Sequence, residues 1–90
     1  MGVQIEVPKF LRHLITGVET ADVSGNTVGE CLRHFVDQHP SSGKLLFDKN
    51  NRLFGHIEIY VNGLSTWPEE LDTPVNDGDS ISMRFLMAGG

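Results

Sequence analysis

The chain has 90 residues, of which 39% are hydrophobic and 21% charged. This composition excludes a disordered chain and predicts a single domain over residues 1–90. The net charge is −5 with only seven lysines and arginines, so we expect no nucleic-acid partner, which would need a concentrated basic surface. No apolar run approaches the ~20 residues that cross a bilayer, so we expect no membrane partner and a cytoplasmic location.

The N-terminal part of the chain has the pattern of a β-hairpin. Apolar residues at alternate positions over residues 3–7 predict a half-buried strand that stops at Pro8. Residues 9–17 are expected to form a connector that reverses at Gly17, and a second strand is expected over residues 18–23.

A helix is predicted to begin at Thr27. Thr27 and Glu30 have the spacing of a capping box, in which the threonine accepts from the N–H of Glu30 and the glutamate reaches back to the N–H of Thr27. The apolar residues that follow share one helical face: Val28, Cys31, Leu32, Phe35 and Val36. Pro40 is expected to end the helix.

The rest of the chain is predicted to add further strands. Residues 45–47 are expected to form a short one. Alternating apolar residues predict strands over residues 57–61 and 81–85, and Asn62-Gly63 supplies the turn after the first of these.

This order of elements predicts an α+β fold of the β-grasp type. One main helix packs across one face of a mixed sheet, because it cannot bury its apolar stripe alone. The last strand can lie beside the first, parallel to it, since the connection between them is long and carries the helix. A free C-terminal Gly-Gly tail is expected over residues 87–90.

Two glycines at the end of the chain suggest chemistry at the carboxylate of Gly90. A carboxylate resists nucleophiles until adenylation with ATP converts it to a mixed anhydride with AMP as the leaving group. Sulfur can then displace AMP and leave a thiocarboxylate, whereas a lysine amine would give an isopeptide bond. Glycine suits threading into a buried site, because it has no side chain and free backbone angles.

The order of elements and several segments together resemble the MoaD/ThiS family of ubiquitin-like sulfur-carrier proteins over essentially the whole chain. The segments that carry the resemblance are Val7–Arg12, Ser24–Gly29, Ile59–Gly63, Asp77–Asp79 and Ala88–Gly90.

The resemblance implies a protein co-substrate and not an enzyme, or the small subunit of a synthase complex. Gly90 would be adenylated by a ubiquitin-activating-type adenylyltransferase, and Gly89, Ala88 and Met87 would occupy its channel. A sulfur-acceptor synthase would then use the thiocarboxylate to make molybdopterin, thiamin thiazole or cysteine. No cofactor would be bound, and the activating partner would consume ATP.

The chain departs from the family in two places. Leu86-Met87 stands where many molybdopterin-type carriers have prolines, and the chain is longer than typical thiazole carriers. The extra segment Leu45–Phe54 resembles the longer carriers, including those that serve cysteine synthesis.

Three residues near the tail are candidate partner contacts. Arg84 and Leu86 alternate with the expected core positions, so they should point away from the helix. Tyr60 faces the same way if its neighbours are buried. An exposed tyrosine and leucine beside an arginine suit a protein interface, and ordinary sheet-surface packing is the alternative.

The other conspicuous residues have structural interpretations. Cys31 lies on the apolar stripe and is expected to be a buried thiol that forms no intrachain disulfide. Asp77 and Asp79 flank Gly78, which favours a reverse turn over a catalytic pair. Trp67, in an expected helical turn, is interpreted as a core or loop-packing residue. No metal site is expected, because the histidines lack ligand spacing.

Three functions therefore remain open from the sequence. The chain is a sulfur carrier, a ubiquitin-like modifier that joins Gly90 to lysines, or a non-covalent ubiquitin-like interaction domain whose glycines are incidental.

Overall fold

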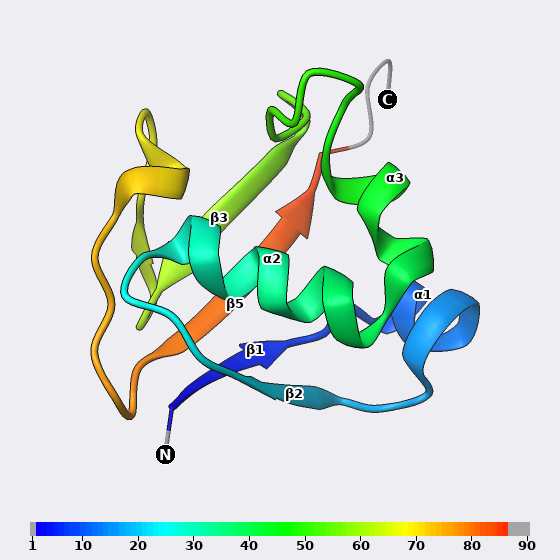
Figure 1. The fold of residues 1–90 in the computed structure, drawn as a ribbon, viewed down its shortest axis with the longest axis horizontal. Coiled ribbons are helices and arrows are strands. Elements are labelled where there is room, and N and C mark those ends of the chain that lie inside the picture. The colour runs from blue at the N-terminus through cyan, green and yellow to red at the C-terminus, as the bar shows by residue number, and fades with distance from the viewer. Residues whose placement is uncertain (1, 87–90) are drawn as a thin grey trace.

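The computed structural model describes residues 2–86, except for the side chains of residues 15 and 16. Its sheet has five strands in the order β2-β1-β5-β3-β4. Their bounds are Val3–Glu6 (β1), Thr20–Val23 (β2), Ile57–Val61 (β3), Leu64–Ser65 (β4) and Ser80–Phe85 (β5). β5 lies between β1, to which it is parallel, and β3, to which it is antiparallel. The expected pairing of the first and last strands is confirmed (Figure 1).

The main helix, α2, spans Val28–Gln38 and crosses one face of the sheet (Figure 1). The Oγ1 of Thr27 accepts the N–H of Glu30 at 3.2 Å, as expected. The return bond differs from the prediction, because the Glu30 carboxylate accepts the N–H of Asn26 at 2.8 Å. Thr27 instead forms a β-bridge with Pro74, which ties the start of the helix to the segment before β5.

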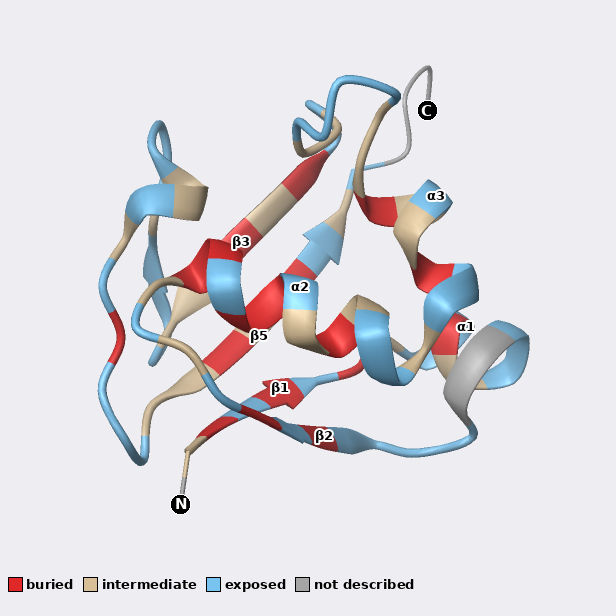
Figure 2. Ribbon diagram, in the orientation of Figure 1, coloured by how far each residue is buried: buried red, intermediate tan, exposed pale blue. Residues whose placement is uncertain are grey.

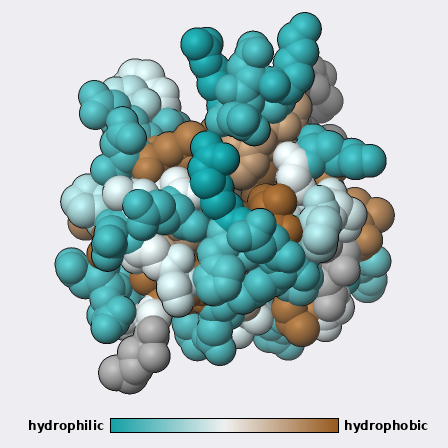
Figure 3. Space-filling view, viewed as in Figure 1, coloured by the Kyte–Doolittle hydropathy of each residue, from teal (hydrophilic) through white to brown (hydrophobic). Residues whose placement is uncertain are grey.

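The core lies between α2 and the sheet. In Figure 2 buried residues alternate with exposed ones along β1 and β2, as a sheet with one covered face requires. The predicted helical stripe is confirmed: Val28, Cys31, Leu32 and Phe35 are fully buried and Val36 is partly buried. Seen from the side of α2, the outer surface is mainly polar (Figure 3).

Close packing fixes one position within α2. Gly29 is buried beside η3, a turn of 3-10 helix over Glu70–Asp72. A Cβ at Gly29 would lie 2.9 Å from the carbonyl oxygen of Leu71. A side chain there would therefore push the helix away from this turn.

The expected connector after β1 is present, and it is helical, which the sequence analysis did not anticipate. α1 spans Lys9–Leu11 and continues into η1, a π-helical turn over Arg12–Thr16. Leu11 is fully buried, so this turn is held by burial of an isolated apolar residue that forms no periodic pattern. Gly17 ends it with a φ of 69°, which confirms the predicted reversal.

The short strand expected at residues 45–47 is wrong for most of its length. A 3-10 turn, η2 (Pro40–Ser42), leads into the helical turn α3 (Gly43–Leu46). Leu46 is fully buried, and only Phe47 has extended pairing, an isolated bridge to Leu53. Three apolar residues in a row are compatible with either a strand or a buried helical turn.

The turn after β3 has the predicted geometry. Asn62 and Gly63 have φ values of 51° and 83°, and they lead into β4, a two-residue strand that the sequence analysis did not anticipate. The helical turn expected at residues 67–71 lies slightly later, in η3. No described helix is long and apolar enough to cross a membrane.

Candidate functional site

The site begins where the central strand of the sheet ends. β5 stops at Phe85, and the N–H of Leu86 donates to the carbonyl of His56 at 2.7 Å. The ring of Phe85 meets the ring of Phe10 edge-on, with centroids 4.9 Å apart and planes at 87°. Backbone pairing and aromatic packing therefore hold the last described residues of β5 firmly against their neighbours.

The face of the sheet opposite α2 carries the predicted partner contacts. Arg84 is exposed and lies directly opposite Glu58 across the β3–β5 pair. The hydroxyl of Tyr60 donates to Oε1 of Glu58 at 3.0 Å. Leu86 is 48% exposed and lines a groove together with Glu58. Arg84 and Tyr60 alternate with core residues along β5 and β3, as expected. The roles of Arg84, Leu86 and Tyr60 as partner contacts stay predictions.

Glu58 is the residue that the sequence analysis missed on this face. It bonds to Tyr60, faces Arg84 and shares a groove with Leu86. Its position between the buried residues Ile57 and Ile59 is the signal that could have identified it, because alternate residues of a strand share a face. The open face thus presents a carboxylate, a phenol and a guanidinium close to the C-terminal end of β5.

Trp67 contradicts its interpretation as a packing residue. Its side chain is 76% exposed, and it follows β4 at the rim of the groove that also contains Leu86. A single tryptophan near an apolar run has no periodicity that distinguishes a buried ring from an exposed one. The exposed ring therefore adds apolar surface beside the open face.

Comparison with known proteins decides the type of protein. No family model matches the chain. The chain is 28% identical over 93 aligned positions to the sulfur carrier protein CysO of Mycobacterium tuberculosis, with all of both chains covered. The chain is similar over its whole length to ubiquitin-like sulfur carriers of the MoaD/ThiS type. Proteins of this type are co-substrates and not enzymes.

Solved structures agree with this assignment. A chain of the BexX/CysO complex of Amycolatopsis orientalis matches this chain with a TM-score of 0.84 and 28% identity, covering 99% of this chain and all of that one. The small archaeal modifier protein 1 of Methanosarcina acetivorans matches with a TM-score of 0.84 and 27% identity, covering 98% of this chain and 95% of that one. The predicted β-grasp fold is confirmed.

The end of the chain that the sequence predicts to be reactive lies outside the described residues. Gly90, with Gly89, Ala88 and Met87, falls beyond residue 86, so the roles predicted for these four residues remain predictions. The structure does describe the strand that precedes these four residues. That strand, β5, is the central strand of the sheet and ends at Phe85.

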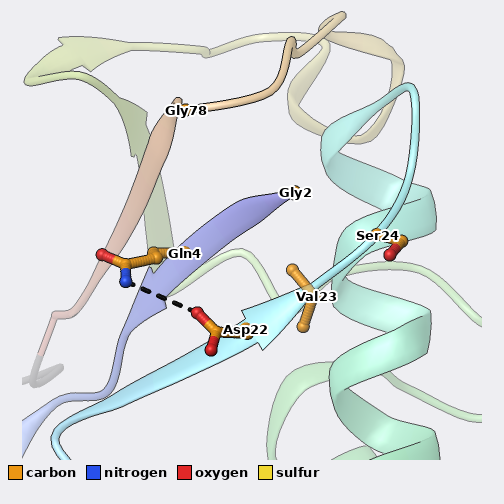
Figure 4. Close-up of a pocket in the computed structure, with 6 residues that line it drawn as sticks. All are labelled: Gly2, Gln4, Asp22, Val23, Ser24 and Gly78. Carbon is orange, nitrogen blue, oxygen red and sulfur yellow. Dashed lines mark hydrogen bonds between the residues drawn. The ribbon is translucent and has the colours of Figure 1, made fainter.

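A second hollow lies at the other end of the sheet from Leu86. It is lined by residues around the start of β1 and the end of β2, where the amide of Gln4 donates to Asp22 at 3.4 Å (Figure 4). Gly78, which also lines it, precedes β5, so the hollow is at the opposite end of that strand from Leu86. Within residues 2–86, no group of three or more histidine, cysteine or acidic residues could hold a metal ion.

Proposed function

We propose that the carrier works through the carboxylate of Gly90 in two steps. A ubiquitin-activating-type adenylyltransferase joins the carboxylate to AMP from ATP and releases pyrophosphate. Hydrosulfide then attacks the acyl carbon, AMP leaves, and the thiocarboxylate loses its proton. If the donor is an enzyme persulfide, the first product is an acyl disulfide, and a thiol must reduce it to give the same thiocarboxylate.

The observation that carries this proposal is the match to the sulfur carrier protein CysO over the full length of both chains. The central strand β5 supports it, because a strand bonded on both sides gives the activating enzyme a rigid support from which to take up the tail. Met87, Ala88 and Gly89 would lie in the activating channel, where small residues allow close approach to the nucleotide.

The acceptor in this proposal is a synthase that makes molybdopterin, thiamin thiazole or cysteine. The Leu45–Phe54 segment favours the longer carriers, including those of cysteine synthesis. The matching chain from Amycolatopsis orientalis occurs in a complex with BexX, which supports direct docking of this chain on an acceptor or activating protein. ATP is consumed by the activating partner, and the carrier itself binds no cofactor. The reactions would take place in the cytoplasm.

An intact-mass measurement tests the proposal. The carrier is incubated with ATP, an adenylyltransferase from the same genome and sulfide. We expect a mass gain equal to the replacement of one oxygen by sulfur, and no gain in a variant that lacks Gly90. A Cys31→Ala variant is the matched control: it should still gain the mass, because a persulfide on Cys31 would add a whole sulfur atom. An unchanged mass with every activating enzyme of that genome would contradict the proposal.

A second function is favoured by the archaeal structures. The small archaeal modifier protein 1 of Methanosarcina acetivorans shares the fold across nearly the whole chain. The same acyl-adenylate would react with a lysine amine to give an isopeptide bond. Adding lysine-containing proteins to the incubation distinguishes the two outcomes: ATP-dependent adducts through Gly90 indicate a modifier, and the thiocarboxylate alone indicates a carrier. If neither product forms, a non-covalent interaction domain is left.

A further inference from the structure

A second groove, here called the α2 groove, lies between the outer side of α2 and the segment that runs from α3 into the following loop. Its volume is about 600 Å³. α3 begins close beside α2 (Figure 1), and a Cβ at Gly43 would lie 3.3 Å from Cγ1 of Val36. The absence of a side chain at Gly43 therefore lets the two helices stand together as the walls of this groove.

The floor of the α2 groove is apolar. Val36 and Phe47, both half-buried, line it. The guanidinium carbon of Arg33 lies over the ring of Phe47, 5.6 Å from the ring centroid. Because cations are attracted to the face of an aromatic ring, this contact holds the exposed Arg33 side chain over the floor. An aromatic side chain that entered the groove would meet two hydrophobic residues and a flat guanidinium on which it can stack.

Cations are concentrated in the α2 groove. Lys44 and Lys49 line it together with Arg33, so three of the seven lysines and arginines of the chain lie here. None of these three side chains makes an ion pair or a hydrogen bond to the described residues. The rest of the chain has four basic and ten acidic residues. The groove is therefore a positive spot on a molecule that is otherwise negative.

The two acidic residues that line the groove differ in their bonding. Oδ1 of Asp48 accepts the N–H groups of Asn50 and Arg52 at 2.8 and 3.1 Å, so this carboxylate shapes its own loop. Asp37 follows Arg33 by four positions on α2, and its carboxylate makes no bond to the described part of the chain. Asp37 would therefore oppose an anion in the groove more strongly than Asp48, whose charge two N–H groups already share.

Charge and size together select the occupant. A long polyanion, such as a nucleic acid or an anionic membrane, would reach beyond the groove and meet the acidic remainder of the surface. A short peptide segment avoids this repulsion, because a groove of about 600 Å³ holds only a few residues. Lys44 and Lys49 come before and after Phe47 in the chain, so an aromatic side chain over the floor is favoured with an acidic residue on each side.

We propose that the α2 groove docks a short segment of a partner protein in which acidic residues flank an aromatic one. The aromatic ring supplies apolar contact with the floor, and the carboxylates neutralise the unpaired cations at its rim. The groove is on the helical side of the molecule, whereas Arg84 and Tyr60 belong to the open face of the sheet. Both surfaces can therefore be occupied at once, and docking here does not depend on the chemistry at Gly90.

A defined peptide tests this docking. The probe is acetyl-Gly-Asp-Phe-Asp-Gly-amide, titrated into the full-length ¹⁵N-labelled chain. We expect saturable shifts of the amides of Arg33, Lys44, Phe47 and Lys49, with a Kd that rises as NaCl is added. Replacing both aspartates of the peptide by asparagine should raise the Kd about tenfold. Replacing its phenylalanine by alanine should have an effect of similar size.

Protein variants provide the matched controls. Lys44→Ala and Lys49→Ala should each raise the Kd about threefold, and the double variant about tenfold. Lys9→Ala should leave the Kd unchanged, because Lys9 is also an exposed lysine but does not line the groove. Asp37→Asn should lower the Kd, since it removes the opposing charge. All four side chains are exposed, so the variants should fold.

Several results would overturn docking of an acidic segment. One is the absence of shifts at the groove amides at several millimolar peptide, and another is equal binding of the asparagine peptide. Equal effects of Lys9→Ala and Lys44→Ala would also overturn it, because net charge alone would then explain the binding. Phenylacetate that bound as tightly as the peptide would assign the groove to a small organic anion instead. Shifts of the same amides on dilution of the chain alone would assign it to a second copy.

Discussion

Asn62 and Asp79 join two turns that are 17 residues apart in the sequence. The side-chain amide of Asn62 donates to Oδ1 of Asp79 at 3.0 Å, and its oxygen accepts the N–H of Ser80 at 3.0 Å. The other oxygen of Asp79 accepts the N–H of Asn76 at 2.8 Å. The turn after β3 thus fixes the start of β5, whose far end leads to the tail. The Asp77–Asp79 segment is a structural turn, as its glycine predicted.

Removing the charge of Asp79 should change the acid stability of the fold. The N–H of Asn76, and then the amide of Asn62, hold the pKa of the Asp79 carboxyl below its ordinary value of 3.8. This contribution to stability is therefore present above pH 3.8 and is lost as the pH falls through the lowered pKa. We expect Asp79→Asn to lower the Tm at neutral pH and to match the wild-type chain in strongly acidic solution, measured by circular dichroism from pH 2 to pH 7.

Asp77→Asn is the control for this measurement. Asp77 is exposed in the same turn, and its carboxylate makes no hydrogen bond to the described part of the chain. It should leave the Tm unchanged. If both substitutions lower the Tm alike, net charge and not the bonds to Asp79 governs acid stability.

The sequence predicted those parts of the fold that repeat a pattern. Alternation located β1, β3 and β5, and the helical stripe with its Thr27 cap located α2. The sequence analysis missed the helical turns around Leu11 and Leu46. Each turn is short and is held by one buried residue, so its apolar residues show no helical periodicity. For the same reason the exposure of Trp67 could not be predicted. Alternation along the strands was enough to place Arg84 and Tyr60 on the open face. That Glu58 lies between them could be seen only from the register between β3 and β5.

Loss of the helix cap should destabilise the fold measurably. Thr27→Ala removes the acceptor of the Glu30 N–H, which is then left at an exposed helix start. We expect a loss of about 1 kcal/mol in the free energy of unfolding, measured by urea denaturation. Thr27→Ser keeps the hydroxyl and should recover most of this loss. A Thr27→Ser variant as unstable as Thr27→Ala would show that the threonine methyl, and not the cap, matters.

Cys31 should be unreactive in the native chain. Its side chain is fully buried, and burial, with a smaller effect of the Glu30 charge, raises the pKa of the Cys31 thiol. The thiolate is the reactive form, so iodoacetamide should label Cys31 in denaturant and not under native conditions, as measured by intact mass. Because the folded pKa is raised, this thiol should also reduce stability as the pH rises above its ordinary value of 9.0. Rapid native labelling would contradict the burial.

The open face should control encounter with the activating enzyme. Arg84 is exposed beside the end of β5, and Tyr60 is held by its bond to Glu58. If this face docks on the adenylyltransferase, Arg84→Ala and Tyr60→Ala should each raise the KM for the carrier about tenfold. The kcat should change little, because neither side chain lies in the reacting tail. The measurement is pyrophosphate release at varied carrier concentration.

Gln4→Ala is the matched control for this prediction, because Gln4 is exposed on the same face but lies near the start of β1, away from Leu86. It should leave the KM unchanged. If all three substitutions changed the KM equally, the cause would be the net charge or the stability of the chain and not docking of this face. A loss of kcat alone would place Arg84 or Tyr60 in the alignment of the tail and not in docking, since binding energy that is common to the ground state and the transition state affects KM.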